Sequence, residues 1–247
     1  MSPPLIFVTA TRSPRSQFES NSPLSRSLLR VGALTPLKLR LFDNNRKALG
    51  ECYNQAIDES PDNACLVFVH DDVYIDDWMA GARVIEALQR FDIVGVAGNT
   101  RCQVGQLTWY LEPGHEIAGQ RQAGVFDHPH LRGAISHGAQ GSAEMTCYGP
   151  APAAVELIDG VFMAARVDRL RQTGVRFDPA LGFHFYDLDL CRAARKSGLR
   201  VGVWPIAITH HSRGGSVQSK QWQQSRLRYL EKYPSNPALP GAGRICD

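Results

Sequence analysis

The 247-residue sequence lacks several features that would assign it to a common class of protein. No stretch approaches the roughly 20 apolar residues that a membrane-spanning helix needs, so we expect no such helix. The first apolar run, in MSPPLIFVTATRSPR, has no basic region ahead of it, and we interpret it as a strand and not as a signal peptide. A formal net charge of +3 is too small to favour nucleic acid as a partner.

Two nucleotide-binding motifs are also missing. There is no GxGxxG after the first predicted strand and no GxxxxGK[ST] anywhere in the chain. Their absence argues against a dinucleotide-dependent oxidoreductase and against a P-loop nucleoside triphosphatase. The six cysteines are scattered without a CxxC pair. That pattern favours free thiols in a reducing cytoplasm over a disulfide scaffold or a zinc site.

An alternation of strand and helix patterns is present instead. Over the first hundred residues, apolar runs alternate with segments whose apolar residues recur at helical spacing. Three such rounds predict βαβ units and an α/β fold with a mostly parallel central sheet flanked by helices. The predicted strands here are 5–9, 37–42, 64–70 and 92–99, and the predicted helices are 22–31, 47–60 and 76–91. We expect a polar turn at 10–17, a serine cap on the first helix and an aspartate cap on the third.

A central segment shows no such pattern. Residues 113–153 are rich in glycine and hold four of the eight histidines. A loop of this length is typically functional or disordered, and we expect a flexible flap over a site. An HxH pair in such a loop is weak evidence for metal. Pattern returns afterwards, with strands around 155–166, a short helix ended by Gly174, helices at 186–197 and 216–233, and a strand-like run at 199–211.

The run LVFVHDDV combines a buried strand with three polar residues. Four apolar residues end in His70, Asp71 and Asp72. Burying a carboxylate without a partner costs roughly several kcal/mol, so these residues are expected where the strand leaves the sheet. In open α/β sheets that edge is where ligands bind. The alternatives are an aspartate that caps a turn or helix, and a histidine that only donates a hydrogen bond.

Two further polar clusters can reach the same edge. Asp187 and Asp189 begin a predicted helix, and His210-His211 follow a predicted strand. Carboxylate and imidazole together suit a divalent cation, and imidazole favours Mn²⁺ over Mg²⁺. Such an ion is most useful against phosphate oxygens, and a remaining carboxylate could accept a proton. The two aspartates are two residues apart and cannot face one substrate atom, and both also suit the helix dipole without any function.

Four segments come in the order and spacing of a known family. LFDNNRKALGECYNQAID, LVFVHDDV, ELIDGVFMAARVD and GFHFYDLDLCRAARKSGLRVGVWPIAITHHSRGGS resemble family 2-like inverting glycosyltransferases with the GT-A fold. The resemblance is to the bacterial subgroup with His-x-Asp at the metal motif, and it covers residues 5–216. It implies one GT-A domain over 1–233, with a nucleotide-binding half at 1–112, a flexible loop at 113–153, an acceptor and catalytic half at 154–233, and a loose tail at 234–247.

The resemblance also implies a catalytic base and a metal site. Asp187 lies where the family has its general base, and Asp189 looks like the structural partner behind it. His70 and Asp72 take the outer positions of the Asp-x-Asp motif, which holds a divalent metal and the sugar diphosphate. His210 or His211 corresponds to a histidine near that metal. His70 replaces an aspartate of the usual motif, which weakens the hold on a hard ion and leaves the strict need for metal open.

The remaining family positions concern the donor. In the resemblance Thr9 to Arg12 wrap the nucleotide, Asp43 and Asn44 contact the base, and Asn54 supports this pocket. Asp71 lies near the ribose, and Asp159-Gly160 line the donor sugar and acceptor. The donor-binding positions are therefore Thr9, Ala10, Thr11, Arg12, Asp43, Asn44, Asn54, Asp71, Asp159 and Gly160. Trp109, Tyr110 and Tyr186 could shape an acceptor site or belong to the core.

The implied activity is transfer of a sugar from a nucleotide-diphospho-sugar, with a UDP-sugar favoured, to an acceptor hydroxyl. The acceptor would be a glycan, a lipid-linked molecule or a protein. Two other classes stay open: a catalytically decayed module that binds a nucleotide-sugar or glycan, and a nucleotidyltransferase. The latter normally has a glycine-rich basic loop after the first strand, whereas TATRSPRS has no glycine. We also expect a cytoplasmic location and, at the basic C-terminal helix, a peripheral membrane contact.

Overall fold

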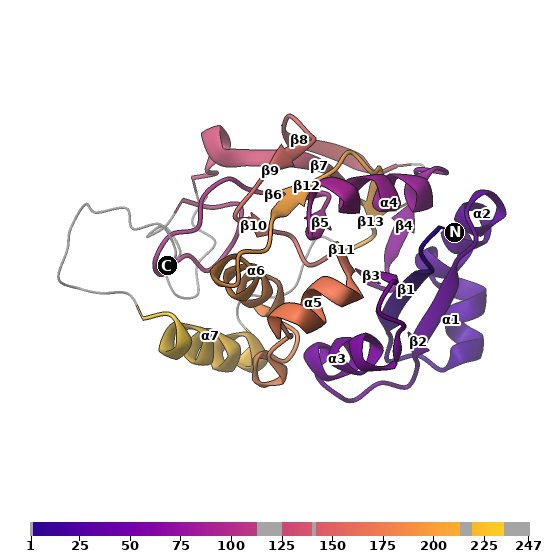
Figure 1. The fold of residues 1–247 in the computed structure, drawn as a ribbon, viewed down its shortest axis with the longest axis horizontal. Helices are drawn as coiled ribbons and strands as arrows, with labels where there is room; N and C mark the ends of the chain where they lie inside the picture. The colour runs from indigo at the N-terminus through magenta and orange to yellow at the C-terminus, as the bar shows by residue number, and fades with distance from the viewer. Residues whose placement is uncertain (1, 113–124, 140–141, 213–218, 235–247) are drawn as a thin grey trace.

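The chain folds into two β-sheets with helices packed around them (Figure 1). The structure is a computed structural model, which describes residues 2–112, 125–139, 142–212 and 219–234. The predicted tail after residue 234 and the first part of the predicted flap, residues 113–124, lie outside these ranges.

The first sheet has seven strands and forms the centre of the molecule. Its strands are β1 (Leu5–Ala10), β2 (Lys38–Phe42), β3 (Cys65–Val69), β5 (Ile93–Gly95), β9 (Ala153–Ala154), β11 (Phe162–Arg166) and β12 (Val201–Val203). They lie in the order β2-β1-β3-β11-β5-β12-β9. Only β11 and β9 run against the common direction of the other five. The predicted α/β fold with a mostly parallel central sheet is therefore confirmed.

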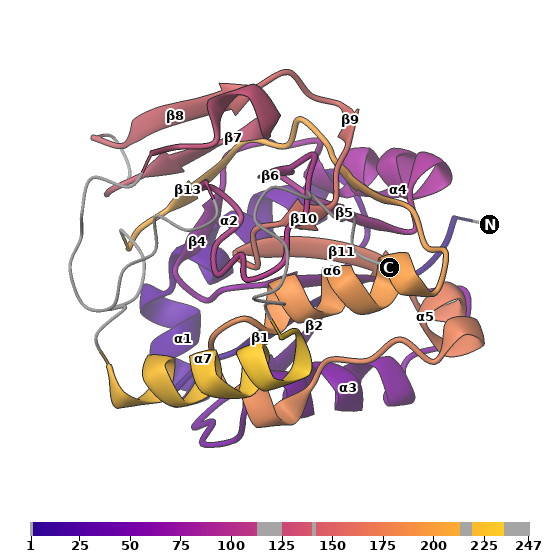
Figure 2. The same cartoon turned by 90° about the vertical axis from the view of Figure 1, so that its left-hand side faces the viewer.

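The second sheet was not apparent from the sequence. Its strands are β4 (Val73–Ile75), β6 (Ala97–Asn99), β7 (Leu131–His137), β8 (Glu144–Gly149), β10 (Leu157–Ile158) and β13 (Ile208–His210). They lie in the order β10-β6-β7-β13-β4, and β8 pairs with β7 as an outer antiparallel strand. The expectation of a flexible loop is therefore wrong for residues 131–137 and 144–149. In both views the β7–β8 hairpin lies at the opposite end of the molecule from the last helix (Figures 1 and 2).

The reason for this error is the composition of the hairpin. Along β7 the inward positions are Leu131, Gly133 and Ile135, so the apolar alternation is interrupted by glycine. A Cβ atom at Gly133 would collide with the carbonyl oxygen of Val96, and its φ of +88° also favours glycine. Most of β8 is exposed, which removes the apolar signal of a strand altogether. Gly133 is therefore a strand residue that must be glycine because the backbone of Val96 lies close to it, although glycine in a sequence usually indicates a loop.

The helices cover the sheets on their outer faces. They are α1 (Arg15–Asn21), α2 (Pro23–Leu34), α3 (Leu49–Glu59), α4 (Ala80–Arg90), α5 (Val167–Thr173), α6 (Tyr186–Lys196) and α7 (Lys220–Lys232), with 3-10 turns η1 (His128–His130) and η2 (Pro179–Leu181). Ser22 caps α2 as predicted, since its side chain accepts from the backbone of Ser25. Gly174 ends α5 in the left-handed conformation, also as predicted.

Two helix starts differ from the prediction. Residues 15–21 form α1, which overlaps the polar turn predicted at 10–17. Phe18 is the only buried residue of this helix, so no helical period is visible. The aspartate cap predicted for α4 is also wrong, because α4 begins after Met79, whose side chain makes no capping bond. Asp77 instead accepts a hydrogen bond of 2.8 Å from the backbone of Met79, and it lies two residues before the N-cap position.

Strand pairing brings distant segments to one edge of the first sheet. β1, β2 and β3 are parallel, so their carboxyl ends lie together, and we call this the carboxyl edge. β11 runs antiparallel to β3 with Phe162 opposite Val69, so the turn before β11 reaches the same edge. β13 pairs with β4 so that His210 lies opposite Val73. Residues from four parts of the sequence therefore meet beyond the end of β3.

Two sequence expectations concern the chain as a whole. Across the described ranges, we find no helix of the length and apolar character that crossing a membrane requires. Cys52, Cys65, Cys147 and Cys191 are free, as predicted. Cys102 is disulfide-bonded, so the expectation of free thiols is wrong at that position. Spacing along the chain does not reveal which cysteines the fold brings together.

Candidate active site

Three of the predicted metal ligands lie together beyond the carboxyl edge. His70 follows β3, Asp72 precedes β4, and His210 is the last residue of β13. One ligand atom from each lies within 4.8 Å of the other two, and His210 Nε2 is 3.3 Å from Asp72 Oδ1. His211 is not in this cluster: its backbone N–H donates to the backbone oxygen of Asp72 at 3.0 Å. The sequence left His210 and His211 as alternative ligands, and in the structure only His210 belongs to the cluster.

Charge and burial set the protonation of this cluster. Burial lowers the pKa of His70, which keeps its imidazole neutral. Burial would raise the pKa of Asp72, but the hydrogen bond and charge of His210 outweigh it and lower that pKa to about 2. The same pairing with Asp72 outweighs burial at His210 and raises its pKa. The cluster therefore offers a carboxylate between two imidazoles, a donor set that suits a divalent cation of borderline softness.

Asp187 lies in the first turn of α6, next to the turn that precedes β11. Its Oδ2 accepts from the backbone N–H of Gly160 at 3.0 Å, and its Oδ1 accepts from that of Leu188 at 2.9 Å. Burial, reinforced by the negative charge of Asp159, raises the pKa of Asp187 to about 7. A carboxylate that gains and loses its proton near neutral pH has the property required of a general base.

The turn Asp159-Gly160 is fixed by groups that the sequence did not connect with it. Trp109 Nε1 donates to Asp159 Oδ2 at 2.9 Å, and the backbone N–H of Val161 donates to Asp159 Oδ1 at 2.8 Å. A Cβ atom at Gly160 would collide with the hydroxyl of Tyr186, so only glycine permits this packing. Trp109 therefore holds the turn from the core side and does not lie free at an acceptor site.

Asp189 faces the other side of α6. It is fully buried, with Lys232 Nζ at 2.7 Å and the Tyr233 hydroxyl donating to its Oδ1 at 2.7 Å. Both partners belong to the end of α7, so Asp189 anchors that helix to α6. The two aspartates therefore have separate partners, as their spacing of two residues predicts.

The ends of β1 and β2 are held side by side by backbone hydrogen bonds. Thr11 N–H donates to the oxygen of Phe42 at 2.9 Å, and Asn45 N–H donates to the oxygen of Thr11 at 2.8 Å. Thr9 is fully buried, and its hydroxyl has no partner among the described residues. Ala10 is partly buried beside it, while Arg12 is exposed. This segment lies at the carboxyl edge, where the sequence placed the nucleotide.

The other predicted donor residues differ in what they can offer. Asn44 is exposed, has a positive φ of 47°, and donates to Asp43 Oδ2 at 3.2 Å. The backbone oxygen of Asp71 accepts from the Ser22 hydroxyl at 2.6 Å. Asn54 has both ends of its amide bound to the backbone of Phe177, at 2.8 and 3.0 Å. Asn54 therefore joins α3 to the loop before η2 through both ends of its amide.

Tyr186 is the residue whose position the sequence reasoning missed. It is buried, 3% exposed, and its hydroxyl lies 2.7 Å from His70 Nε2 and donates to the oxygen of Gly160 at 3.0 Å. It therefore joins the His70–Asp72–His210 cluster to the turn that holds Asp187. Its place directly before Asp187 was visible in the sequence, but the direction of its side chain was not. Phe183, which is exposed, packs its ring 5.4 Å from that of His70.

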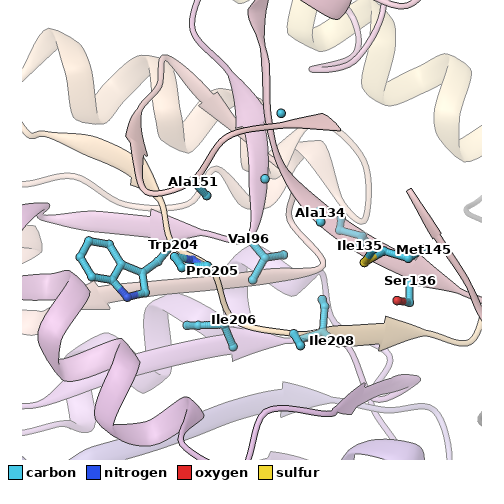
Figure 3. A pocket seen from close by; sticks show the side chains of 13 residues that line it. Val96, Ala134, Ile135, Ser136, Met145, Ala151, Trp204, Pro205, Ile206 and Ile208 are labelled. Carbon is cyan, nitrogen blue, oxygen red and sulfur yellow. The ribbon is translucent and has the colours of Figure 1, made fainter. Parts of the chain in front are cut away.

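A cavity of about 290 Å³ lies elsewhere, along the second sheet (Figure 3). Figure 3 shows that Val96, Ile135, Met145, Ile206 and Ile208 line it, with β7 on one side and the chain leading into β13 on the other. None of the residues predicted to bind metal or donor, or to act as the base, lines this cavity. The chemistry-bearing side chains therefore gather outside it, at the carboxyl edge.

Comparisons with known proteins bear on this arrangement. The model of a family described as "Glycosyltransferase like family" matches residues 41–234, a range that contains His70, Asp72, Asp187 and His210. No curated protein matches the sequence.

Two solved structures are similar to this chain at low identity. One is A197 from STIV, with 12% identity, a TM-score of 0.45 and 82% of each chain covered. The other is GalNAc-T7, crystallised with UDP, GalNAc and Mn²⁺, with 13% identity and a TM-score of 0.49. That comparison covers 93% of this chain and 48% of the other, so the present chain spans about half the length of that protein.

Proposed function

The chain belongs to the glycosyltransferase-like family and has the GT-A fold, and from that premise we propose that it is an inverting, hexosyltransferase-like glycosyltransferase. The proposed donor is a nucleotide-diphospho-sugar, with UDP as the nucleotide. The proposed acceptor is a hydroxyl of a glycan, a lipid-linked molecule or a protein. The observation that carries the proposal is the convergence of His70, Asp72 and His210 with Asp187 beyond the end of β3, joined through Tyr186 and Gly160.

We propose that His70, Asp72 and His210 hold a divalent cation. Ligand atoms on opposite sides of an ion lie about 4.2 Å apart at bond lengths of about 2.1 Å, and the three ligand atoms here lie within 4.8 Å of one another. The residues therefore fit such an ion after small side-chain movements. Two imidazoles among three ligands favour Mn²⁺ over Mg²⁺. When bound, the cation supplies positive charge against the departing diphosphate.

In the proposed reaction Asp187 accepts the proton of the acceptor hydroxyl. As that proton leaves, the acceptor oxygen forms a bond to the anomeric carbon of the donor sugar, and the bond from that carbon to the diphosphate oxygen breaks. Attack on the face opposite the leaving group inverts the configuration. The hydrogen bonds from Gly160 and Leu188 orient the carboxylate for this step. Its pKa of about 7 lets it accept a proton near neutral pH.

We further propose that the carboxyl edge of β1, β2 and β3 binds the nucleotide. The segment Thr9–Arg12 would lie along it, Asp43 and Asn44 would contact the base, and Asp71 the ribose. The backbone hydrogen bonds of Thr11, which hold the ends of β1 and β2 side by side at this edge, support the placement. The cytoplasmic location and a peripheral contact of α7 with a membrane stay predictions from the sequence.

Sugar transfer tests the proposed function directly. The purified protein would be incubated with Mn²⁺, a sugar acceptor, and UDP-, GDP-, dTDP- or CDP-sugars, and the release of nucleoside diphosphate and of pyrophosphate would be followed separately. We expect one donor to give nucleoside diphosphate without pyrophosphate. A nucleotidyltransferase would instead release pyrophosphate in a second incubation, in which a nucleoside triphosphate and a sugar 1-phosphate replace the nucleotide-sugar. Absence of both, with nucleotide-sugar still bound in calorimetry, would favour a binding module.

A variant pair makes the same assay specific to the site. Asp187→Asn removes the proposed base. Asp168→Asn changes an aspartate in the corresponding first turn of α5, whose carboxylate accepts from the Arg166 side chain and from the backbone N–H of Arg169. We expect Asp187→Asn to lose transfer and to retain donor binding, and Asp168→Asn to behave as the wild type. Equal activity in both variants would remove Asp187 from its proposed role.

A further inference from the structure

The hydroxyl of Tyr186 makes two contacts with one proton. It lies 2.7 Å from His70 Nε2 and 3.0 Å from the backbone oxygen of Gly160. A carbonyl oxygen can only accept a hydrogen bond, so Tyr186 uses its proton on Gly160. For the second contact to be a hydrogen bond as well, His70 must carry its proton on Nε2 and donate it to the tyrosine oxygen. The other ring nitrogen, Nδ1, is then unprotonated.

We propose that Tyr186 is a positioning residue that fixes His70 in the Nε2–H tautomer and so reserves Nδ1 as the cation ligand. This proposal rests on the proposed function, because it specifies how one ligand of the proposed metal site is prepared. Metal-binding histidines generally donate their second ring N–H to a fixed acceptor, which sets both the tautomer and the ring orientation. Here that acceptor is a phenol oxygen, held in place in turn by the backbone of Gly160.

The surroundings of Tyr186 fix its hydroxyl from two sides. Its ring packs against Tyr53 and Phe177, with centroids 6.1 and 6.2 Å away. On the opposite side the hydroxyl contacts Gly160, where any Cβ atom would collide with it. The oxygen therefore has little freedom to follow a different orientation of His70.

Tyr53 provides a matched control. Its ring belongs to the same buried aromatic cluster, and its hydroxyl has no hydrogen-bond partner among the described residues. Tyr53→Phe therefore removes a buried hydroxyl without breaking a hydrogen bond, whereas Tyr186→Phe removes the hydroxyl that contacts His70. Both changes keep the ring, so a difference between the two variants reports on the hydrogen bond.

The first measurement is the tautomer of His70 in the metal-free protein. Long-range ¹H–¹⁵N correlation spectra at pH 7.5 distinguish the two neutral tautomers by their ring nitrogen shifts, and the signals of His70 are identified by their absence in His70→Ala. We expect Nε2–H in the wild type and in Tyr53→Phe, and a mixture of tautomers in Tyr186→Phe. Nδ1–H in the wild type would overturn the proposal, and this measurement needs no variant of Tyr186 to fold.

The second measurement is Mn²⁺ affinity by titration calorimetry. Loss of such a supporting hydrogen bond typically weakens metal binding about 10- to 100-fold, and we expect at least about a tenfold loss in Tyr186→Phe and none in Tyr53→Phe. Wild-type affinity in Tyr186→Phe together with an unchanged tautomer would overturn the proposal. A third outcome separates the two proposals. If the wild type has the Nε2–H tautomer, Tyr186→Phe lacks it, and the wild type binds no Mn²⁺, then the metal site of the proposed function is overturned. Tyr186 would still be supported as the group that fixes His70.

Discussion

The two sides of the first turn of α6 carry the same kind of residue and put it to different use. On one side Asp187 contacts the turn at Gly160, and through Tyr186 this side continues to His70. On the other side Asp189 is fully buried against Lys232 and the Tyr233 hydroxyl. We call these the reactive side and the anchoring side. The partners of each carboxylate differ: within the described ranges the hydrogen bonds to the Asp187 side chain come from backbone N–H groups, whereas Asp189 is paired with the Lys232 cation.

The largest expected effect is on the reactive side, in the rate of transfer. Asp187→Asn keeps the size of the side chain but cannot accept a proton, so we expect the turnover number to fall by roughly 10²–10⁴-fold. Donor affinity should stay within about twofold, because Asp187 lies on the acceptor side of the proposed reaction. Initial rates and calorimetry measure the two quantities. A parallel loss of donor affinity would place Asp187 in binding and not in proton transfer.

The next effect separates two neighbouring histidines. His210→Ala removes a proposed ligand and the partner of Asp72, and we expect Mn²⁺ affinity to fall by more than about 100-fold, since even supporting groups cost 10- to 100-fold. His211→Ala keeps the backbone N–H that donates to Asp72, so its affinity should match the wild type. Calorimetric titration of both variants checks this. Equal losses in the two would mean that the cluster of His70, Asp72 and His210 is not the binding site.

On the anchoring side we expect a loss of stability and not of chemistry. Asp189→Asn breaks the pairing with Lys232 and leaves buried polar groups poorly matched, which should cost about 1–3 kcal/mol of folding free energy. For a chain of this size that lowers Tm by roughly 2–4 °C per kcal/mol. Thermal unfolding measures the loss, and the rate per folded molecule should be unchanged. A large loss of turnover at unchanged Tm would erase the distinction between the two sides.

The smallest effect is a pH dependence of stability on the reactive side. The pKa of Asp187 in the folded chain, about 7, lies above its ordinary value of 3.8, so the unfolded chain releases this proton first. The Asp187 carboxyl therefore lowers the free energy of unfolding progressively as pH rises from about 4 to about 7. Above pH 7 this loss of stability is complete. Asp187→Asn lacks this loss of stability, so its Tm relative to the wild type should rise between pH 4.5 and pH 7 and level off above that range.

A difference in Tm that stays constant with pH would contradict the raised pKa of Asp187. Asp168→Asn serves as the control in this series too. Its carboxylate is partly exposed and pairs with the exposed Arg166, so its effect on Tm should be small throughout that range.

The features that the sequence predicted depend on short, local patterns. The strand before His70 is wholly apolar, so the charged residues after it had to lie outside the sheet, and the structure places them at its carboxyl edge. Asp187 and Asp189 point to different sides of α6 because they are two residues apart on a helix. Both conclusions need only the geometry of one element.

The features that the sequence did not predict depend on pairing between distant segments. The choice of His210 over His211 comes from the register of β13 on β4, which no local pattern contains. The contact of Tyr186 with His70 joins residues that are 116 positions apart. The β7–β8 hairpin was hidden because Gly133 and the exposed residues of β8 carry no apolar alternation. Such features require the three-dimensional arrangement of the backbone.

A crystal structure of the protein with Mn²⁺ and UDP, in which anomalous scattering locates the metal, would show directly whether the proposed ligands and the carboxyl edge form the donor site. We expect one Mn²⁺ bound by His70, Asp72 and His210, with the diphosphate against it and the nucleoside along the carboxyl edge of β1 and β2. A nucleotide bound away from that edge, or Mn²⁺ held by other residues, would contradict both the proposed metal site and the proposed nucleotide site.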